Sequence, residues 1–181
     1  MYEPREDTYL LEDSIRQLPY TRGIVVEVGC GPGYLLRVLT EKADEVVGVE
    51  LQLQALLEAR GRLAGEENNR LHLIQANHLT CFRPNSRITL VVANPPYLPS
   101  DNRFFDETIH GGPTGIEVAL EMVEEALRVM KNSLRALVVL SSLSNIRSFE
   151  EHVRRLGLRV SRKNSRRLFF EELTCLEISK E

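Results

Sequence analysis

Residues 23–33 read GIVVEVGCGPG, an apolar, β-branched run that ends in a turn containing three glycines. The run predicts a buried strand from Gly23 to Val28, and the pattern after the turn predicts a helix from Tyr34 to Lys42. Glycines between a strand and a helix let the backbone bend sharply and approach a ligand closely. This part of the chain therefore predicts a βα unit that holds a ligand in its turn.

The rest of the sequence continues the alternation of apolar runs and amphipathic patterns. Further strands are predicted at Glu45 to Val49, Leu71 to Gln75, Ile88 to Ala93 and Leu134 to Leu140, and helices at Leu51 to Leu63, Ile116 to Lys131 and Ser148 to Leu156. A closing antiparallel pair is predicted at Leu158 to Ser161 and Leu168 to Ile178. We therefore expect an α/β fold, a single domain over residues 1–181 with a doubly wound, mostly parallel seven-stranded sheet. Ligands are expected at the carboxyl ends of its strands.

The composition is that of an ordinary globular domain. Hydrophobic residues make up 43% of the 181 and charged residues 27%. No apolar run reaches the roughly 18 residues of a membrane span, and the N-terminus lacks a secretion signal. A cytoplasmic protein without membrane contact is therefore expected. Cys30, Cys81 and Cys175 match no metal-binding spacing, so we expect free thiols and no metal site.

The net charge of −3 is unevenly distributed. Residues 154–167 carry seven basic and no acidic side chains, so the remainder of the chain carries −10 (−3 minus 7). An acidic bulk is unlike a protein that coats a nucleic-acid duplex by neutralising phosphates. The basic run from Arg154 to Arg167 either contacts RNA or an acidic partner, or is a solvated helix end and hairpin.

Glu27 and the glycines after it differ from a dinucleotide-binding turn. Counted from Gly31, the third glycine of the pattern G-x-G-x-x-G would fall at Leu36 and is absent. Glu27 lies just before the turn, where a carboxylate could hold a cationic, amino-acid-like ligand. Gly29, Gly31 and Gly33 are the glycines expected to surround that ligand.

Polar residues also follow the next two predicted strands. Glu50 ends the second strand, where a carboxylate can accept hydrogen bonds from both hydroxyls of a ribose. Its alternative role is to favour the start of the next helix through the helix dipole. Leu51 follows it and is assigned to the same site. Asn77 or His78, after the third strand, would contact an adenine ring unless they are only polar turn residues.

Asn94-Pro95-Pro96-Tyr97, here called the tetrad, follows the fourth predicted strand and opens a loop that extends to residue 115. The Asn94 side-chain oxygen and the Pro95 carbonyl can grip the two N–H groups of a planar, weakly nucleophilic nitrogen and aim it at a methyl donor. The prolines stiffen this cradle, and Tyr97 offers a flat surface to a planar substrate. Alone, the four residues could be a common proline turn. Beside the glycine turn and Glu50 they predict N-methyl transfer.

These motifs resemble the class I S-adenosylmethionine-dependent methyltransferases, whose fold is Rossmann-like. The resemblance covers nearly the whole chain. It implies S-adenosylmethionine as the cofactor, with its methionine end in the glycine turn, and S-adenosylhomocysteine as the product. One departure is visible, because Asn77-His78 stand where this class usually carries Asp.

Two flanking segments resemble the HemK-type protein glutamine methyltransferases, which modify the Gln of the Gly-Gly-Gln loop of peptide-chain release factors. They are Tyr2 to Leu11 (YEPREDTYLL) and His110 to Ile116 (HGGPTGI). The resemblance implies a lid over the cofactor, made by Pro4, Glu6, Asp7 and Thr8, and a site mouth shaped by Gly111 and Gly112. The alternatives are a capped first helix and a flexible loop before a helix.

The predicted domain begins near Met1, without the additional N-terminal helical domain of bacterial HemK-type enzymes, and so resembles the shorter archaeal and eukaryotic branch. That branch implies a small zinc-binding activator subunit, docked on Leu71 to Gln75 if this strand is an open edge. Three other functions stay open: an adenine-N6 or guanine-N2 methyltransferase acting on RNA or DNA, a protein lysine methyltransferase, and a non-catalytic, cofactor-binding scaffold subunit. The complete tetrad favours an enzyme over the scaffold.

Overall fold

The computed structural model describes residues 4–65, 70–84, 86–100, 106, 108–130 and 134–180. Its elements are α1 (Glu6–Arg16), β1 (Thr21–Val28), α2 (Tyr34–Thr40), β2 (Ala43–Glu50), α3 (Leu53–Arg62), β3 (Leu71–Gln75), β4 (Ile88–Ala93), α4 (Glu117–Met130), β5 (Arg135–Ser141), α5 (Ile146–Arg155), β6 (Arg159–Arg167) and β7 (Glu172–Ser179). The predicted start of the lid segment at Tyr2 and the predicted helix end at Lys131 lie outside the described residues.

The strands form one seven-stranded sheet in the order β3-β2-β1-β4-β5-β7-β6. β1 to β5 pair in parallel, and β7 runs antiparallel to both β5 and β6. The predicted α/β sheet with its C-terminal antiparallel pair is therefore confirmed. Within the described residues β3 has only β2 as a neighbour, so it is an edge of the sheet, as β6 is at the other side.

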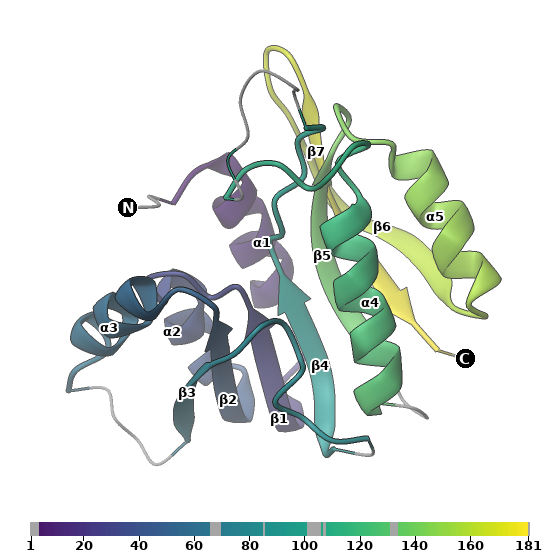
Figure 1. Ribbon diagram of the computed structural model, residues 1–181. Helices are drawn as coiled ribbons and strands as arrows, with labels where there is room; N and C mark the ends of the chain where they lie inside the picture. The colour runs from purple at the N-terminus through teal and green to yellow at the C-terminus, as the bar shows by residue number, and fades with distance from the viewer. Residues whose placement is uncertain are drawn as a thin grey trace.

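The sheet lies between two layers of helices (Figure 1). One face packs on α4 and α5 through a core that includes Val26, Val28 and Phe149, and the other packs on α1 and α2 through a core that includes Val25 and Leu36. Consecutive β1 residues enter opposite cores because successive side chains of a strand point to opposite faces. This alternation explains why the central strands read as continuous apolar runs.

The largest difference from the predicted elements is in the closing hairpin. β6 extends to Arg167 rather than Ser161, and β7 begins at Glu172 rather than Leu168. β6 is an edge strand with many exposed side chains, so its sequence lacks the apolar pattern that marks the inner strands. α5 begins at Ile146 rather than Ser148, because the Asn145 side chain accepts a hydrogen bond from the main-chain nitrogen of Ser148 at 3.1 Å and caps the helix.

Within the described residues, the structure holds no helix with the length and apolar character needed to cross a membrane. The same residues contain no cluster of three or more His, Cys, Asp or Glu side chains suited to a metal ion. Cys30 and Cys175 are buried free thiols, and Cys81 is an exposed one.

Candidate active site

The carboxyl ends of β1, β2 and β4 lie side by side because these strands are parallel neighbours. Val28 pairs with Val49 of β2 and with Ala93 of β4. The glycine turn (residues 29–33) follows β1, Glu50 ends β2, and the tetrad follows β4 (Figure 1). Three predicted groups of site residues therefore meet at the carboxyl ends of the parallel strands.

The glycines of the turn have two different roles. Gly29, Gly31 and Gly33 all adopt positive φ angles of 69°, 51° and 79°, which side chains disfavour. A Cβ atom built on Gly29 or Gly31 would meet nothing within 4 Å, so open space faces both residues. A Cβ on Gly33 would lie 3.0 Å from the Cβ of Ala59 on α3. Gly29 and Gly31 therefore leave room for a ligand, whereas Gly33 permits close helix packing.

Glu50 is tied to the turn by its carboxylate. Its Oε2 accepts a hydrogen bond from the Gly31 main-chain nitrogen at 2.9 Å, and its Oε1 accepts one from the Gln52 nitrogen at 2.8 Å. Gln52 is the N-cap of α3, so the alternative role at a helix start is also met. Because each carboxylate oxygen has two acceptor sites, both oxygens retain capacity for hydroxyl donors.

Glu27 is a buried acidic residue with an unsatisfied side-chain oxygen. Its side chain is 5% exposed, and its Oε2 has no hydrogen-bond partner among the described residues. Burial, and then the nearby charge of Glu50, raise the pKa of Glu27 well above its usual value. A cation bound in the glycine turn would supply the missing partner and favour the ionised form.

The tetrad is held in place by groups from two distant segments. The Oδ1 atom of Asn94 is shielded from solvent, and Pro95 is buried. The Tyr97 carbonyl accepts a hydrogen bond from the Ser144 hydroxyl at 2.7 Å. The Tyr97 hydroxyl donates to Oδ2 of Asp7 at 3.2 Å. These contacts fix the backbone and the ring of Tyr97 at the same time.

Residues 108–115 pack behind the tetrad. The main-chain nitrogen of Leu98 donates to the Ile109 carbonyl, and the Gly111 nitrogen donates to the Leu98 carbonyl, both at 2.9 Å. A Cβ on Gly111 would overlap the carbonyl oxygen of Pro96. Gly111 therefore touches the backbone of the predicted cradle itself.

Two further glycines complete the packing of this segment. A Cβ on Gly115 would overlap the Tyr97 carbonyl oxygen, and one on Gly112 would lie 2.5 Å from the Glu117 carboxylate. Partial burial opposes ionisation of Glu117, but hydrogen bonds from Thr114 outweigh it and lower its pKa. An ionised Glu117 thus closes the loop onto the start of α4.

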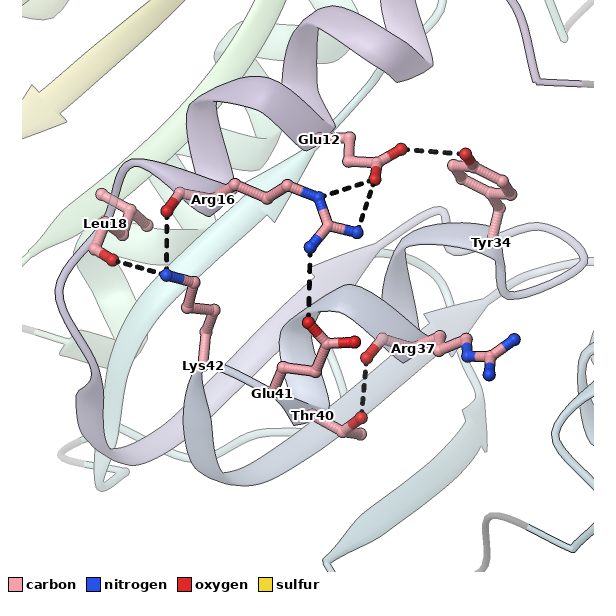
Figure 2. A network of polar contacts seen from close by, with 8 residues as sticks. All are labelled: Glu12, Arg16, Leu18, Tyr34, Arg37, Thr40, Glu41 and Lys42. Carbon is pink, nitrogen blue, oxygen red and sulfur yellow. Dashed lines mark hydrogen bonds and ion pairs between the residues drawn. The ribbon is translucent and has the colours of Figure 1, made fainter.

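Helix α1, which carries the predicted lid, is tied to α2 by polar contacts (Figure 2). Glu12 accepts hydrogen bonds from Arg16 and from the Tyr34 hydroxyl, both at 2.8 Å, and Arg16 also pairs with Glu41 at 3.3 Å. Lys42 donates to the Arg16 carbonyl at 2.8 Å. Tyr34 is the residue directly after the glycine turn, so this network holds α1 beside the turn.

The four predicted lid residues differ in their surroundings. Asp7 and Thr8 are buried, Pro4 is half-buried, and Glu6 is exposed. Asp7 also accepts a hydrogen bond from the main-chain nitrogen of Thr8 at 2.7 Å. Because Asp7 contacts Tyr97, the start of α1 lies directly against the tetrad.

The predicted adenine residues lie further from this group. Asn77 and His78 line a hollow of about 340 Å³ together with Glu121, Glu125 and other side chains of α4. Leu51 is 55% exposed next to Glu50. The Ala76 nitrogen donates to the Glu50 carbonyl at 3.1 Å, so the segment of Asn77 starts beside Leu51, but the structure gives no contact between Asn77 or His78 and the glycine turn.

Two site residues escaped the sequence analysis. Ser144 lies in a run of serines and leucines without distinctive spacing, and only the fold brings it to Tyr97. Gly115 carries a signal, since it is the third glycine of the segment that resembles the HemK-type enzymes, but its contact with the tetrad depends on tertiary packing.

The fold of this protein is that of the class I methyltransferases. A family model described as a methyltransferase domain matches residues 25–110. Among solved structures, the Mtq2–Trm112 complex of E. cuniculi, described as responsible for methylation of the eRF1 translation termination factor, has a similar fold, with a TM-score of 0.80 at 25% identity. The match covers 99% of this chain and 98% of that one.

Several curated relatives align with the sequence, and three of them are described. A ribosomal RNA small subunit methyltransferase of Arabidopsis thaliana is 36% identical over 64% of this chain and 32% of its own length. A release factor glutamine methyltransferase of Caulobacter vibrioides is 32% identical over 71% of this chain and 49% of its own length. A protein named as an N5-glutamine methyltransferase of Methanocaldococcus jannaschii is 24% identical over 97% of this chain and 90% of its own length.

The chain thus spans about a third to a half of the length of the first two of these relatives and most of the third. Taken with the structural match, they confirm the resemblance inferred from residues 2–11 and 110–116. In sequence and in fold, the chain therefore resembles the HemK-type protein glutamine methyltransferases.

Proposed function

We propose that this protein transfers a methyl group from S-adenosylmethionine to the side-chain amide nitrogen of a glutamine, in the Gly-Gly-Gln loop of a peptide-chain release factor. The observation that carries the proposal is the position of the tetrad. It follows β4 at the carboxyl ends of the strands, where the glycine turn and Glu50 also lie. Gly111, Ser144 and Asp7 contact it and hold it in place. A cradle for a planar N–H₂ group thus adjoins a cradle for the methyl donor.

The residues at the carboxyl ends of these strands suit S-adenosylmethionine, which supplies an electrophilic methyl carbon when bound. The uncompensated carboxylate of Glu27 fits its ammonium group, and the open side of Gly29 and Gly31 leaves room for its methionine end. Glu50 would accept the ribose hydroxyls. Leu51 offers an exposed apolar surface for the adenine, with Asn77 or His78 beyond it.

The part of the tetrad is to orient a poor nucleophile. The amide nitrogen is planar because its lone pair is delocalised, so gripping both N–H groups with the Asn94 oxygen and the Pro95 carbonyl aims that lone pair at the methyl carbon. The Tyr97 ring would pack on the amide plane. Bound S-adenosylmethionine would supply the methyl group from its sulfonium sulfur, and the amide nitrogen that accepts it would release a proton to solvent.

RNA methylation is the second candidate, favoured by the likeness to the Arabidopsis ribosomal RNA enzyme. The basic run supports it weakly, because several of its cations are balanced within the protein. Arg154 and Arg162 both pair with Glu150, at 2.9 and 3.7 Å, and Arg166 pairs with Asp13 at 3.0 Å. Any RNA contact through residues 154–167 would have to compete with these pairs.

A small zinc-binding activator subunit is proposed as a partner at β3. This strand is a sheet edge, and on the adjacent helix α3 the side chains of Leu53 and Leu57 are 52% and 51% exposed. An open edge flanked by apolar side chains is suited to pairing with a strand of another chain. The E. cuniculi neighbour is itself described as a complex of two proteins.

The test supplies radiolabelled S-adenosylmethionine, the activator subunit, and either a release factor or ribosomal RNA. Label is expected in the release factor, on glutamine rather than lysine when the modified peptide is sequenced by mass spectrometry. Asn94→Ala should bind the cofactor within about threefold of wild type and lose at least about 100-fold in transfer, since orientation contributes several kcal/mol. Asn164→Ala, on the distant strand β6, is the control and should transfer normally.

Each alternative has its own result. Label that enters only RNA contradicts the release-factor proposal, and label on lysine contradicts the glutamine assignment. A protein that binds the cofactor in calorimetry but methylates neither substrate supports the scaffold alternative. Unchanged turnover of Asn94→Ala removes Asn94 from the mechanism.

A further inference from the structure

An aromatic tip projects from the β6–β7 hairpin without apolar cover. Phe169 and Phe170 are 91% and 85% exposed, and their rings contact each other edge to face with centroids 4.6 Å apart. They line a surface hollow of about 390 Å³. Scattered apolar side chains are ordinary on a protein surface, but two large rings side by side form a patch of the kind enriched at binding interfaces.

The tip is built onto the segment that holds the tetrad. The Ser142 nitrogen donates to the Glu172 carbonyl at 2.8 Å, and the Ser142 hydroxyl accepts from the Glu172 nitrogen at 2.9 Å. Two residues further along, the Ser144 hydroxyl holds the Tyr97 carbonyl at 2.7 Å. Because two residues span at most about 7 Å, the base of the hairpin and Tyr97 lie within a distance on the order of 15 Å. Figure 1 shows the hairpin at the same end of the molecule as the segment that follows β4.

We propose that Phe169 and Phe170 are a docking site for the protein substrate and contact apolar side chains near the glutamine that is methylated. The inference rests on the proposed function and deepens it. The tetrad grips the amide, and the tip binds the surface that presents it. A free amide is too small to reach the tetrad and the tip together, whereas a folded protein offering a loop can reach both.

The charges at the tip favour protein over RNA. Arg166 pairs with Asp13 at 3.0 Å and is therefore balanced within the protein. Arg167 lines the hollow, but Glu171 and Glu172 line it too. Their carboxylates would repel a phosphate backbone, which disfavours the stacking of nucleobases on the two rings.

The experiment compares wild type with the double variant Phe169→Ser/Phe170→Ser, both with the activator subunit. Tyr20→Ala, at an exposed tyrosine just before β1 and thus at the opposite end of the sheet, is the matched control. The double variant should raise the KM for a complete release factor by about tenfold or more, because buried aromatic residues at an interface carry much of the binding energy. Its kcat should stay within about twofold of wild type. Cofactor affinity and the thermal unfolding midpoint should not change. A short synthetic Gly-Gly-Gln peptide, which does not reach the tip, should be methylated equally by wild type and variant.

Binding is also measured directly, as the Kd for the release factor in the presence of S-adenosylhomocysteine. A tenfold weaker Kd for the double variant supports the docking site even without turnover. A wild type that methylates the release factor while the variant keeps the same KM and Kd overturns the docking site and leaves the function standing. A wild type that binds the release factor without methylating it overturns the function alone. If the double variant binds a ribosomal RNA fragment more weakly but the release factor normally, the rings bind RNA and the docking site for the release factor is overturned. A wild type that binds neither the RNA nor the release factor overturns both proposals.

Discussion

The hydroxyl of Tyr97 donates a hydrogen bond to the carboxylate of Asp7 across 3.2 Å, although 90 residues separate the two in the chain. One residue belongs to the tetrad and the other to the first turn of α1. The polar network between α1 and α2 holds this helix beside the glycine turn (Figure 2). The proposed lid over the cofactor and the proposed cradle for the substrate are therefore mechanically joined.

Tyr97→Phe should weaken S-adenosylmethionine binding by about tenfold, because a hydrogen bond to a charged acceptor contributes roughly 1.5 kcal/mol and this one positions the lid. The substitution keeps the ring that packs on the substrate. Calorimetric titration of the cofactor measures the effect. Tyr9→Phe, at an exposed tyrosine of the same helix, is the control and should bind normally.

A double-mutant cycle with Asp7→Ala separates the contact from other effects of each substitution. If the hydrogen bond carries the effect, the double variant Asp7→Ala/Tyr97→Phe should bind the cofactor about as weakly as Asp7→Ala alone. Strictly additive losses would show that the two residues act independently, and the lid would then not depend on Tyr97.

The pH dependence of stability should depend on Glu27. Its pKa is raised in the folded protein by burial and by Glu50, so the folded state retains a proton that the unfolded chain loses from about pH 4.3 upward. The free energy of unfolding of the ligand-free protein should therefore fall as the pH rises from the unfolded to the folded pKa. Glu27→Gln removes this fall, and its thermal midpoint at pH 8 should exceed that of wild type by roughly 2–4 °C, as expected for about 1 kcal/mol.

Cofactor binding should show the opposite dependence. An ammonium group pairs with the ionised carboxylate, so wild-type affinity should rise with pH through the pKa of Glu27 and binding should release a proton. Calorimetry in buffers of different ionisation enthalpy measures that proton. Glu151→Gln, at an exposed carboxylate, should leave both pH profiles unchanged. A wild-type affinity that is flat with pH would contradict the assignment of Glu27 to the ammonium.

Local sequence patterns predicted the features of this protein that residues close together in the chain determine. The bounds of β3 and β4 were correct, because both are apolar runs bounded by polar turn residues, and the tetrad follows β4 as predicted. β6 was predicted too short because an edge strand needs no apolar pattern. The contacts of Ser144 and Gly115 with Tyr97 were missed, since they depend on how segments distant in sequence pack together.

Gly111→Ala tests whether residues 108–115 position the cradle. The added Cβ would overlap the Pro96 carbonyl oxygen, which belongs to the backbone and moves only if the tetrad moves. Overpacking of this kind costs roughly 1–3 kcal/mol, so the thermal midpoint should fall by several degrees. The kcat of methyl transfer should fall by about tenfold or more, because orientation of the amide is lost.

Gly61→Ala is the matched control for this substitution. Neither glycine has a φ in the left-handed region, so backbone strain plays no part in the comparison. A Cβ on Gly61 in α3 meets nothing within 4 Å, and Ala should stabilise the helix by roughly 0.5–1 kcal/mol with activity unchanged. Full activity in Gly111→Ala at an unchanged midpoint would show that the tetrad tolerates displacement here.

The edge of β3 offers a test of the activator subunit. The Arg70 carbonyl and the Ala76 main-chain nitrogen both form hydrogen bonds with β2. Main-chain groups of successive residues point to opposite sides of a strand, so the main-chain nitrogen of Gln75 points away from β2. Gln75→Pro removes this outward donor without removing a bond between β2 and β3. Gln75→Ala keeps the donor and, like the proline variant, loses the side-chain hydrogen bond to the Leu51 carbonyl at 3.2 Å.

Pairing of the subunit through main-chain bonds predicts that Gln75→Pro weakens its binding by about tenfold or more, whereas Gln75→Ala binds as wild type does. Co-purification followed by a titration with the purified subunit measures the difference, with the thermal midpoint confirming that both variants are folded. Equal losses in the two variants would indicate recognition through the Gln75 side chain. Normal binding by both would place the subunit elsewhere, because a strand added to this edge has to meet the main chain at Gln75.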